Sequence, residues 1–112
     1  MQEAITFLEN MQPVGELTWN SGIAKACQDH VMDHGPIGAT GHDGSDGSDP
    51  GARMARYGRV KIGWSENCAY GHSTGIEIVM GLFVDDGVPS RGHRSNLVST
   101  NSKDTGNFTG PH

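Results

Sequence analysis

The sequence predicts an α+β fold, with several short helices and a small amount of β-structure. Two segments carry apolar residues at the spacing of one helix face, and a third alternates apolar and polar residues as a strand does. The chain of 112 residues also contains 17 glycines, which implies many turns between these elements. This length leaves room for one core, so we expect a single domain over residues 1–112.

Two helices are expected in the first third of the chain. The first covers Glu3–Asn10 and ends before the turn Gln12–Gly15. The second begins at Asn20 or Ser21, because either side chain can accept hydrogen bonds from the free N–H groups of a helix N-terminus. The apolar positions of this second helix recur every four residues, at Ile23, Cys27 and Val31.

The second helix also carries His30 and His34, whose spacing places both on one face, where they could together hold a metal ion. A zinc site needs about three protein ligands, and the pair has no third ligand nearby in the sequence. We therefore favour a packed His30 and a His34 that the helix dipole stabilises in the last turn, before Gly35–Pro36 ends the helix.

A third, short helix is expected after the small and polar loop of residues 38–48. Asp49 can cap this helix, Pro50 suits its first position, and Gly58 closes it. The residues that follow alternate in polarity and predict a strand, with apolar positions at Val60, Ile62 and Trp64.

The longest helix is expected to begin at Thr74, where Thr74 and Glu77 can form a capping box. It places Asp85 and Asp86 at its C-terminus, where the helix dipole disfavours anions. We therefore expect a compensating cation, which is Arg91, Arg94 or a metal ion. The expected buried stripe of this helix consists of Ile76, Val79, Met80 and Phe83.

The stretch Asp85–Asn96, which reads DDGVPSRGHRSN, is the one around which we expect a site to be organised. Gly87 and Pro89 oppose continuation of the helix, so the charged side chains are expected on an ordered turn. Two other stretches carry the same mixture of Gly, acid and His, namely Gly41–Ser48 and Ser65–Gly71. Three such stretches in one small chain favour a shared site.

The two cysteines, Cys27 and Cys68, form no CxxC motif. Both lie among apolar positions where the second helix should cover the strand, so we expect them to approach each other. On residue type alone we expect two free, buried thiols. A disulfide becomes the expectation if the chain is secreted.

Composition excludes two classes of partner. The net charge of −5 leaves no basic patch to displace counterions from phosphates, so nucleic acid is not an expected partner. No apolar run approaches the roughly 20 residues that cross a bilayer, so no transmembrane segment is expected. Met1 runs directly into a polar, helix-like segment, so we expect a cytosolic chain or a mature or excised domain.

The order of motifs resembles that of a known family. Along the chain stand ACQDHVMDHGP, GHDGSDGSDPGARMARYG, SENCAYG, a helix, DDGVPSRGHRSNL and TGPH. This arrangement resembles the SCP/CAP family of cysteine-rich secretory proteins, insect antigen 5 proteins and plant pathogenesis-related proteins, and is most similar to its compact bacterial and protist form. The resemblance covers nearly the whole chain. It implies an α-β-α sandwich, with a small antiparallel sheet between helical layers and a cleft above the sheet.

The resemblance also implies a site, because family members usually place two histidines and two acids in that cleft and some bind zinc or another divalent cation there. Matched position by position, the metal set is His42, Glu66, Asp86 and His112. The neighbouring cleft residues are then His93, Arg91, Arg94 and Asp85. Two imidazoles with one or two carboxylates suit zinc with an open position for water.

The chain departs from the family pattern in three places. Ser65 replaces the glycine before Glu66, and Asp86 stands where longer relatives often have glutamate. The chain also stops at His112, where relatives continue into a last core strand. We therefore expect a domain truncated at the C-terminus, without its last strand and with a disordered or displaced His112 in the absence of metal.

For function, the resemblance implies a secreted, non-enzymatic domain that recognises a small lipid, a peptide or a cell-surface partner. A metal-dependent hydrolase with Glu66 as its base is one alternative, and a purely structural extracellular module is another. Arg53 and Arg56 are expected to pair with acids rather than with a substrate, the candidates being Asp46, Asp49 and Asp86. A buried polar network without metal would use Glu66, Asp86, His42 and His93.

Overall fold

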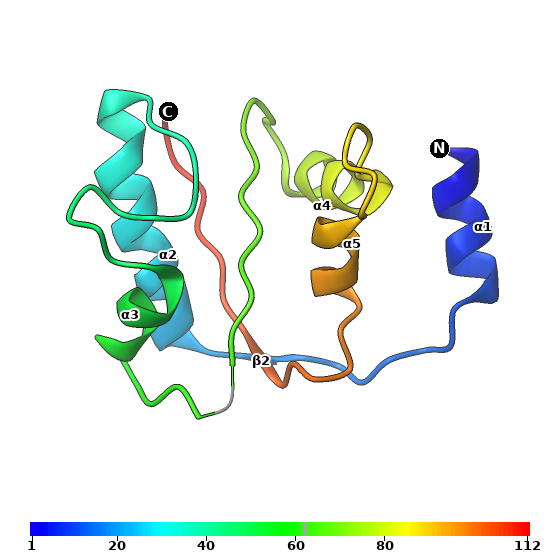
Figure 1. The fold of residues 1–112 in the computed structure, drawn as a ribbon, viewed down its shortest axis with the longest axis horizontal. Helices are drawn as coiled ribbons and strands as arrows, with labels where there is room; N and C mark the ends of the chain where they lie inside the picture. The colour runs from blue at the N-terminus through cyan, green and yellow to red at the C-terminus, as the bar shows by residue number, and fades with distance from the viewer. Residues whose placement is uncertain (62) are drawn as a thin grey trace. The chain divides into compact units, whose positions relative to one another are not determined.

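The computed structural model describes residues 1–61 and 63–112, and the chain forms two compact units (Figure 1). Unit 1 consists of Met1–Gly15 and Ala69–Asn101, and unit 2 consists of Glu16–Cys68 and Ser102–His112. Each unit therefore combines two separate stretches of the sequence. The expected single domain and the expected α-β-α sandwich both describe how the two units are arranged together. Both therefore stay predictions.

The elements of each unit are short. The helices described in unit 1 are α1 (Gln2–Asn10), α4 (Gly75–Val84) and α5 (Gly92–Leu97). The elements described in unit 2 are β1 (Thr18–Trp19), α2 (Ser21–His34), the 3-10 helix η1 (Gly35–Ile37), α3 (Pro50–Ala55) and β2 (Asp104–Thr105). The longest helix is α2, with 14 residues against 10 for α4, so the expectation that the helix after Thr74 is longest is wrong.

Three of the predicted helix starts are confirmed, because each of these depends on a side chain close to the N–H groups that it satisfies. Asn20 accepts hydrogen bonds from two backbone N–H groups in the first turn of α2, at 2.9 and 3.1 Å. Asp49 accepts one from Ala52 at 2.8 Å and so begins α3, which has Pro50 in its first turn. Thr74 and Glu77 form the expected capping box of α4.

The sheet differs from the expected one. Strands β1 and β2 pair in parallel, with Thr18 opposite Asp104 and Trp19 opposite Thr105, so the antiparallel expectation is wrong for this sheet. No strand is assigned to the described residues around Val60 and Trp64, and the expected strand position Ile62 lies outside the described residues.

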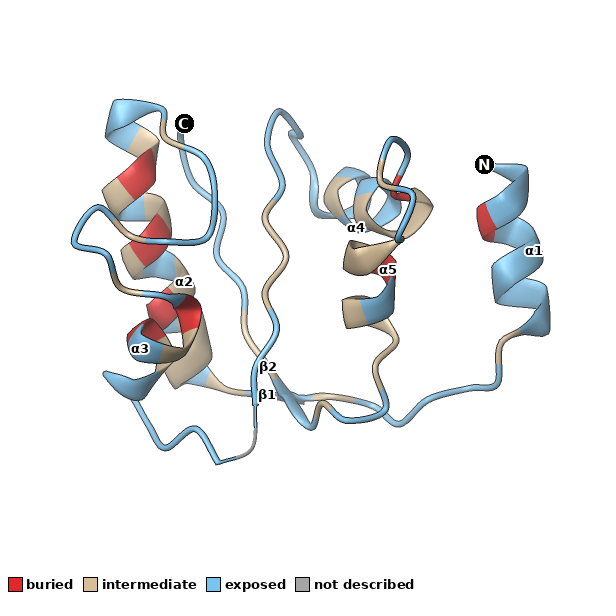
Figure 2. Cartoon of the chain, in the orientation of Figure 1, coloured by how far each residue is buried: buried red, intermediate tan, exposed pale blue. Residues whose placement is uncertain are grey.

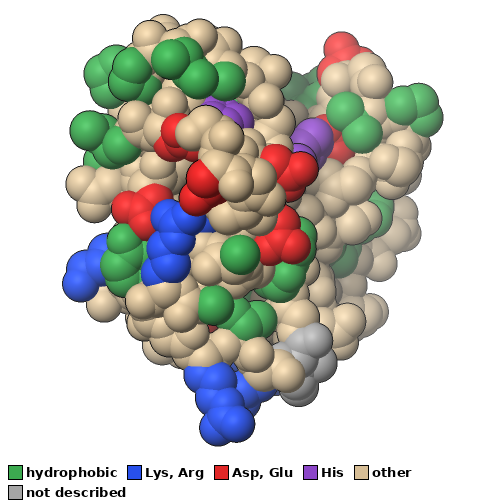
Figure 3. Space-filling model, turned by 60° about the vertical axis from the view of Figure 1, so that its left-hand side comes forward, with side chains coloured by type: hydrophobic (Ala, Val, Ile, Leu, Met, Phe, Trp, Pro, Cys, Tyr) green, Lys and Arg blue, Asp and Glu red, His purple; other side chains and the backbone are tan. Residues whose placement is uncertain are grey.

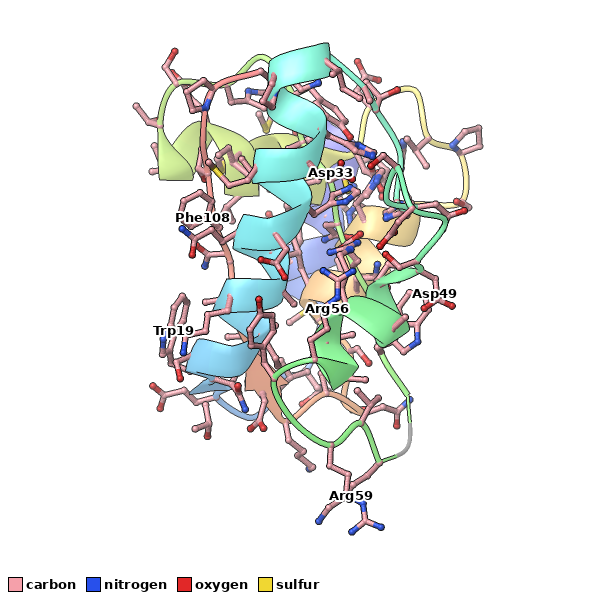
Figure 4. The ribbon with its side chains drawn as sticks, turned by 90° about the vertical axis from the view of Figure 1, so that its left-hand side faces the viewer. Trp19, Asp33, Asp49, Arg56, Arg59 and Phe108 are labelled. Carbon is pink, nitrogen blue, oxygen red and sulfur yellow. The ribbon has the colours of Figure 1, made fainter. Side chains whose placement is uncertain are left out.

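The parallel pairing follows from what comes after each strand. β1 leads into α2, and β2 leads into residues 106–112, which run beside α2 in the same direction (Figure 4). Gly106 contacts the first turn of the helix, whereas Gly110 contacts Val31 further along it. Two chains that run the same way after their strands leave the strands parallel.

Buried positions are few and mostly polar in the described part of the chain (Figure 2). The buried residues are Ala4, Ala26, Pro50, His30, His34, Arg53, Asp85 and Arg94. The expected buried stripe of α4 is wrong at three positions, because Ile76, Val79 and Met80 are 74%, 53% and 47% exposed. Within unit 1 the helix contacts α1 and α5, and these contacts involve its fourth stripe residue, Phe83.

Arg94 occupies the centre of unit 1 and is 1% exposed. Its guanidinium donates to both carboxylate oxygens of Glu3, at 2.6 and 2.8 Å, and to the carbonyl oxygens of Phe83 and Val84. The ring centroids of Phe7 and Phe83 lie 4.9 and 5.2 Å from the guanidinium carbon. A buried cation thus joins α1, α4 and α5, which is favourable because its charge and its donors are satisfied.

The Glu3–Arg94 pair predicts how the stability of unit 1 depends on pH. The hydrogen bond from Arg94 lowers the pKa of Glu3 from 4.5 to about 2. Folding therefore favours the ionised carboxylate, so this contribution is complete above pH 4.5 and is lost as the pH falls toward 2. We expect Glu3→Gln to lower the unfolding midpoint near neutral pH and the gap to wild type to close on acidification.

Thermal unfolding followed by circular dichroism across that pH range measures the gap. Glu9→Gln, on the same helix and also exposed, is the matched control and should follow wild type. A gap between wild type and Glu3→Gln that stays constant down to the lowest pH would contradict the argument.

The contact of Gly106 with α2 predicts a second effect. A Cβ at this position would overlap the backbone nitrogen of Ala24 and lie 2.9 Å from the carbonyl oxygen of Asn20. These are backbone atoms that cannot rotate away, so Gly106→Ala should destabilise the protein by about 1–3 kcal/mol in chemical denaturation. Gly58→Ala, where a Cβ meets no atom within 4 Å, should leave stability unchanged or slightly raised. Equal effects of the two substitutions would contradict the packing of residues 106–112.

Candidate functional site

Glu66 lies at the centre of a polar cluster in unit 2. The Nδ1–H of His42 donates to Glu66 Oε1 at 2.9 Å, although the two residues belong to distant parts of the sequence. The Nη2 atom of Arg53 lies 2.9 Å from both Oε1 and Oε2 of the same carboxylate. The expected proximity of His42 and Glu66 is therefore confirmed.

Three elements position this cluster. His42 follows Gly41, which has a φ of +107° that only glycine adopts without strain. The carbonyl oxygen of His42 accepts a hydrogen bond from Arg53 Nη2 at 2.9 Å, which fixes the loop against α3. Nη1 of Arg53 donates to the carbonyl oxygen of Ala26 at 3.3 Å, so α2 is attached as well.

The electrostatics of Glu66 reflect these partners. Burial raises the pKa of this carboxyl group, but the hydrogen bonds from Arg53 and His42 and the charge of Arg53 outweigh burial. The pKa of Glu66 is therefore below its ordinary value of 4.5, and the group is ionised at neutral pH. An ionised carboxylate beside an imidazole has the charge and the lone pairs that a divalent cation requires.

Two residues that the sequence did not assign to the site also belong to the cluster. Cys68 Sγ lies 3.6 Å from His42 Nδ1 and 3.7 Å from Glu66 Oε1. One ligand atom each from His30, Glu66 and Cys68 lies within 4.8 Å of the others, which is close enough to share a metal ion. The available signal for Cys68 was its position two residues after Glu66, because residues i and i+2 share one side of an extended segment.

His30 and His34 are both buried, at 7% and 6% exposure, and their ring centroids are 4.1 Å apart. The expected packing of His30 is therefore confirmed. The statement that the pair has no third ligand nearby is wrong, because a carboxylate oxygen of Asp33 lies within 4.8 Å of a ring nitrogen of each histidine. The sequence signal was present, since Asp33 stands three residues after His30 on the same helix.

Arg56 binds the acids around this region. It lies 3.0 Å from Asp29 and 3.3 Å from Asp46, and basic and acidic side chains adjoin on this face of the molecule (Figure 3). The expected pairing with Asp46 is confirmed for Arg56. For Arg53 the expected acids are wrong, because its partner is Glu66.

Asp85 of unit 1 is bound to the start of α5, and its expected place beside a cleft stays a prediction. It is 4% exposed and accepts hydrogen bonds from the backbone N–H groups of His93 and Arg94 and from His93 Nδ1, the last at 2.8 Å. Its carboxylate therefore caps α5, and the second half of the expected ordered turn is a helix. The N-terminus of α5 and the hydrogen bond from His93 satisfy this carboxylate, and the charge of the buried Arg94 also acts on it, although the described residues show no direct ion pair of Asp85 with Arg91 or Arg94.

The two arginines serve the fold of unit 1. Arg91 donates to the carbonyl oxygen of Asp85 at 2.6 Å and to Glu3 at 3.1 Å, and Arg94 binds Glu3 from the other side. Their expected place in a cleft stays a prediction. Asp86, the expected acid of the metal set, is exposed. It belongs to unit 1, whereas His42, Glu66 and His112 belong to unit 2, so the four-residue set also stays a prediction.

His112 is attached in unit 2. Its Nε2–H donates to the carbonyl oxygen of Ala39 at 2.7 Å. The packing of residues 106–112 along α2 brings the ring to the residues that follow η1, and the expected displacement from the family position stays a prediction. This hydrogen bond leaves Nδ1 as the ring atom with a lone pair.

Neither Cys27 nor Cys68 forms a disulfide in the described part of the chain, as expected on residue type. They are half-buried rather than buried. Cys27 Sγ donates to the carbonyl oxygen of Gly106 at 3.6 Å. Burial raises the pKa of the Cys27 thiol, and the negative charge of Glu66 adds to this effect.

Comparison with known proteins gives one match. A family model described as the cysteine-rich secretory protein family, CAP, matches residues 10–108. The chain belongs to the CAP family. The resemblance found in the motifs of the sequence is thereby confirmed. No curated protein and no solved structure matches the chain.

The CAP chain also has no helix suited to a bilayer among residues 1–61 and 63–112. None of the described helices combines the length and the apolar character that crossing a membrane requires.

The burial of Arg53 predicts a large effect of its removal from this CAP domain. Arg53 is 2% exposed, and Arg53→Met would leave the Glu66 carboxylate half-buried without its cation. Removing one partner of a buried pair typically costs about 3–5 kcal/mol, so we expect a loss of that size in chemical denaturation. Arg56→Met is the matched control on the same part of the chain, because its side chain is 39% exposed. The control should cost about 1 kcal/mol or less. A loss no larger than that of the control would contradict the central place of Arg53.

Proposed function

We propose that this CAP domain binds a divalent metal ion, with zinc preferred, at the cluster around Glu66, and that it recognises a small lipid, a peptide or a cell-surface partner outside the cell. The observation that carries the metal site is the grouping of an ionised Glu66 with His42, Cys68 and His30 in one place. The secreted location and the kind of partner rest on family membership, since the family is described as one of secretory proteins.

The ligand types favour zinc among the common divalent cations. Imidazole nitrogen and thiolate sulfur are ligands that zinc prefers to magnesium or calcium, and a carboxylate completes a usual set. His42 has its Nδ1 proton on Glu66, so its Nε2 carries the lone pair in the metal-free state. In the full proposal, Asp86 and His112 add the second acid and the second histidine of the family set.

A ligand role for Glu66 is better supported than a role as general base. An efficient general base has a pKa near the working pH, whereas the pKa of Glu66 is lowered by Arg53 and His42. A hydrolase that uses Glu66 as its base would need an environment that raises this pKa. The structure around Glu66 therefore favours binding over catalysis.

The test is a zinc titration of the metal-free protein, followed by the ring signals of His42 in NMR and by calorimetry. We expect the His42 signals to shift on zinc addition. Glu66→Gln and His42→Ala should each weaken binding at this site by at least about tenfold, as even an indirect change near a metal does. Asp86→Asn and His112→Ala test the other two residues of the family set. Both substitutions should weaken zinc binding if all four residues are ligands.

The control is His72→Ala, an exposed histidine of unit 1 outside the proposed set, which should bind as wild type does. Unchanged affinity in both Glu66→Gln and His42→Ala would overturn the metal site. No zinc binding by the wild-type protein would instead favour a purely structural module. Zinc-dependent peptide hydrolysis that Glu66→Gln abolishes would favour the hydrolase.

A further inference from the structure

A second group of metal-ligating side chains lies on α2, away from the residues that match the family site. It consists of His30, Asp33 and His34, and one ligand atom from each lies within 4.8 Å of the others. The two histidines are one helical turn apart, and this is the spacing at which helix-borne histidine pairs bind zinc on one face. Asp33 supplies a carboxylate from the same turn.

The two imidazoles are buried but incompletely hydrogen-bonded. Nδ1 of His30 and Nδ1 of His34 are both buried without a hydrogen-bond partner among the described residues. A buried polar atom without a partner is costly, so native proteins usually satisfy it. For His30 this buried atom is one that a bound ligand could satisfy.

The hydrogen bond of His30 determines which atom can accept a metal. Its Nε2 lies 2.8 Å from the carbonyl oxygen of Gly41, and a carbonyl can only accept, so the proton is on Nε2. The lone pair is then on Nδ1, the atom without a partner. A histidine ligand whose other nitrogen donates to a backbone carbonyl is the usual arrangement around a metal, because that bond fixes the ring and its tautomer.

His34 faces Asp33 through its other ring nitrogen, Nε2, rather than through its unpartnered Nδ1. Its Nε2 is 3.9 Å from Asp33 Oδ2, which is beyond hydrogen-bond distance. A cation between the ring and the carboxylate would convert this long contact into two coordination bonds.

Asp33 is oriented by Ser45. The backbone N–H of Ser45 donates to Oδ2 at 2.7 Å, and its hydroxyl donates to Oδ1 at 2.6 Å. The carboxylate is therefore held in place, yet each oxygen keeps a further lone pair. The side chain of Asp33, labelled in Figure 4, is 31% exposed. It lines a hollow of about 110 Å³ together with Arg53 of α3, so an ion can reach this carboxylate from solvent.

Nearby cations do not neutralise this group. Arg53 and Arg56 also line the hollow, but Arg53 is paired with Glu66, and Arg56 is paired with Asp29 and Asp46. Within the described residues Asp33 has no arginine or lysine partner. Its negative charge is thus available to a metal ion.

We propose that His30, Asp33 and His34 form a second divalent-metal site, for zinc or a cation of similar preference such as cobalt(II) or nickel(II). Two imidazole nitrogens and one carboxylate oxygen are a three-ligand set for such ions and leave an open position for water. None of the three residues belongs to the set that the family resemblance implies. The site does not depend on the proposed function, although His30 also lies within reach of Glu66 and Cys68.

His30 lies within reach of both the cluster around Glu66 and the proposed site on α2, which we call the helix site. Asp33 and His34 are therefore the residues that distinguish the helix site. The test titrates Zn²⁺ into the metal-free full chain and follows the ring nitrogen signals of His34 and His42 separately by NMR, with calorimetry for affinity. We expect both sets of signals to shift. Asp33→Asn and His34→Ala should each weaken the binding that His34 reports by at least about tenfold and leave the binding at His42 within about twofold.

Two comparisons separate this site from the one around Glu66. Glu66→Gln should leave the His34 response intact, and Ser45→Ala, which removes the hydroxyl that orients Asp33, should weaken it by about 10–100-fold. Asp33→Asn keeps the size of the side chain, so it remains informative if His34→Ala fails to fold. No shift of the His34 signals at saturating zinc, or equal affinity in wild type and Asp33→Asn, would overturn the helix site whatever happens at His42.

Discussion

The interaction on which unit 2 depends is the contact between the buried guanidinium of Arg53 and the carboxylate of Glu66. Arg53 is 2% exposed, and its two terminal nitrogens bind α2 through Ala26, the loop through His42, and Glu66 itself. A buried cation requires a nearby anion, because an unpaired charge away from water costs several kcal/mol. The requirements of Arg53 therefore bring together the three parts of the chain that form the candidate site.

Unit 1 uses the same principle with Arg94 and Glu3. In the described part of the chain, the buried apolar residues are Ala4, Ala26 and Pro50. Neither unit is therefore centred on large aliphatic side chains. Satisfied polar networks specify geometry strongly, because each missing hydrogen bond is expensive. This explains why an apolar stripe was a poor guide to burial in α4, where its first three positions are exposed.

What the sequence could predict depends on the range of the interaction. The caps Asn20, Asp49 and Thr74 were predictable, because each acts on N–H groups two or three residues away. Which of the two acids, Asp85 or Asp86, would cap the following helix was not predictable. Asp85 has a φ of 54°, and this left-handed turn directs its carboxylate to the N-terminus of a helix that begins seven residues later. Motif resemblance found His42 and Glu66, and Cys68 follows from its place two residues after Glu66. The partners Arg53 and His30 instead depend on tertiary contacts that have no local signal.

The charges of the two groups in unit 2 differ, and this difference bears on how each would hold a cation. Glu66 is already matched by Arg53, so an ion there enters a balanced pair and needs a further negative ligand, such as a Cys68 thiolate. Asp33 receives its hydrogen bonds from the neutral Ser45 and, within residues 1–61 and 63–112, has no arginine or lysine as an ion-pair partner. Coulomb attraction would therefore favour the first ion at α2, whereas coordination by a thiolate beside Glu66 would release a proton and so would strengthen as the pH rises. Helix α2 thus borders two groups of side chains, and the local balance of charge that a metal ion would meet differs between them.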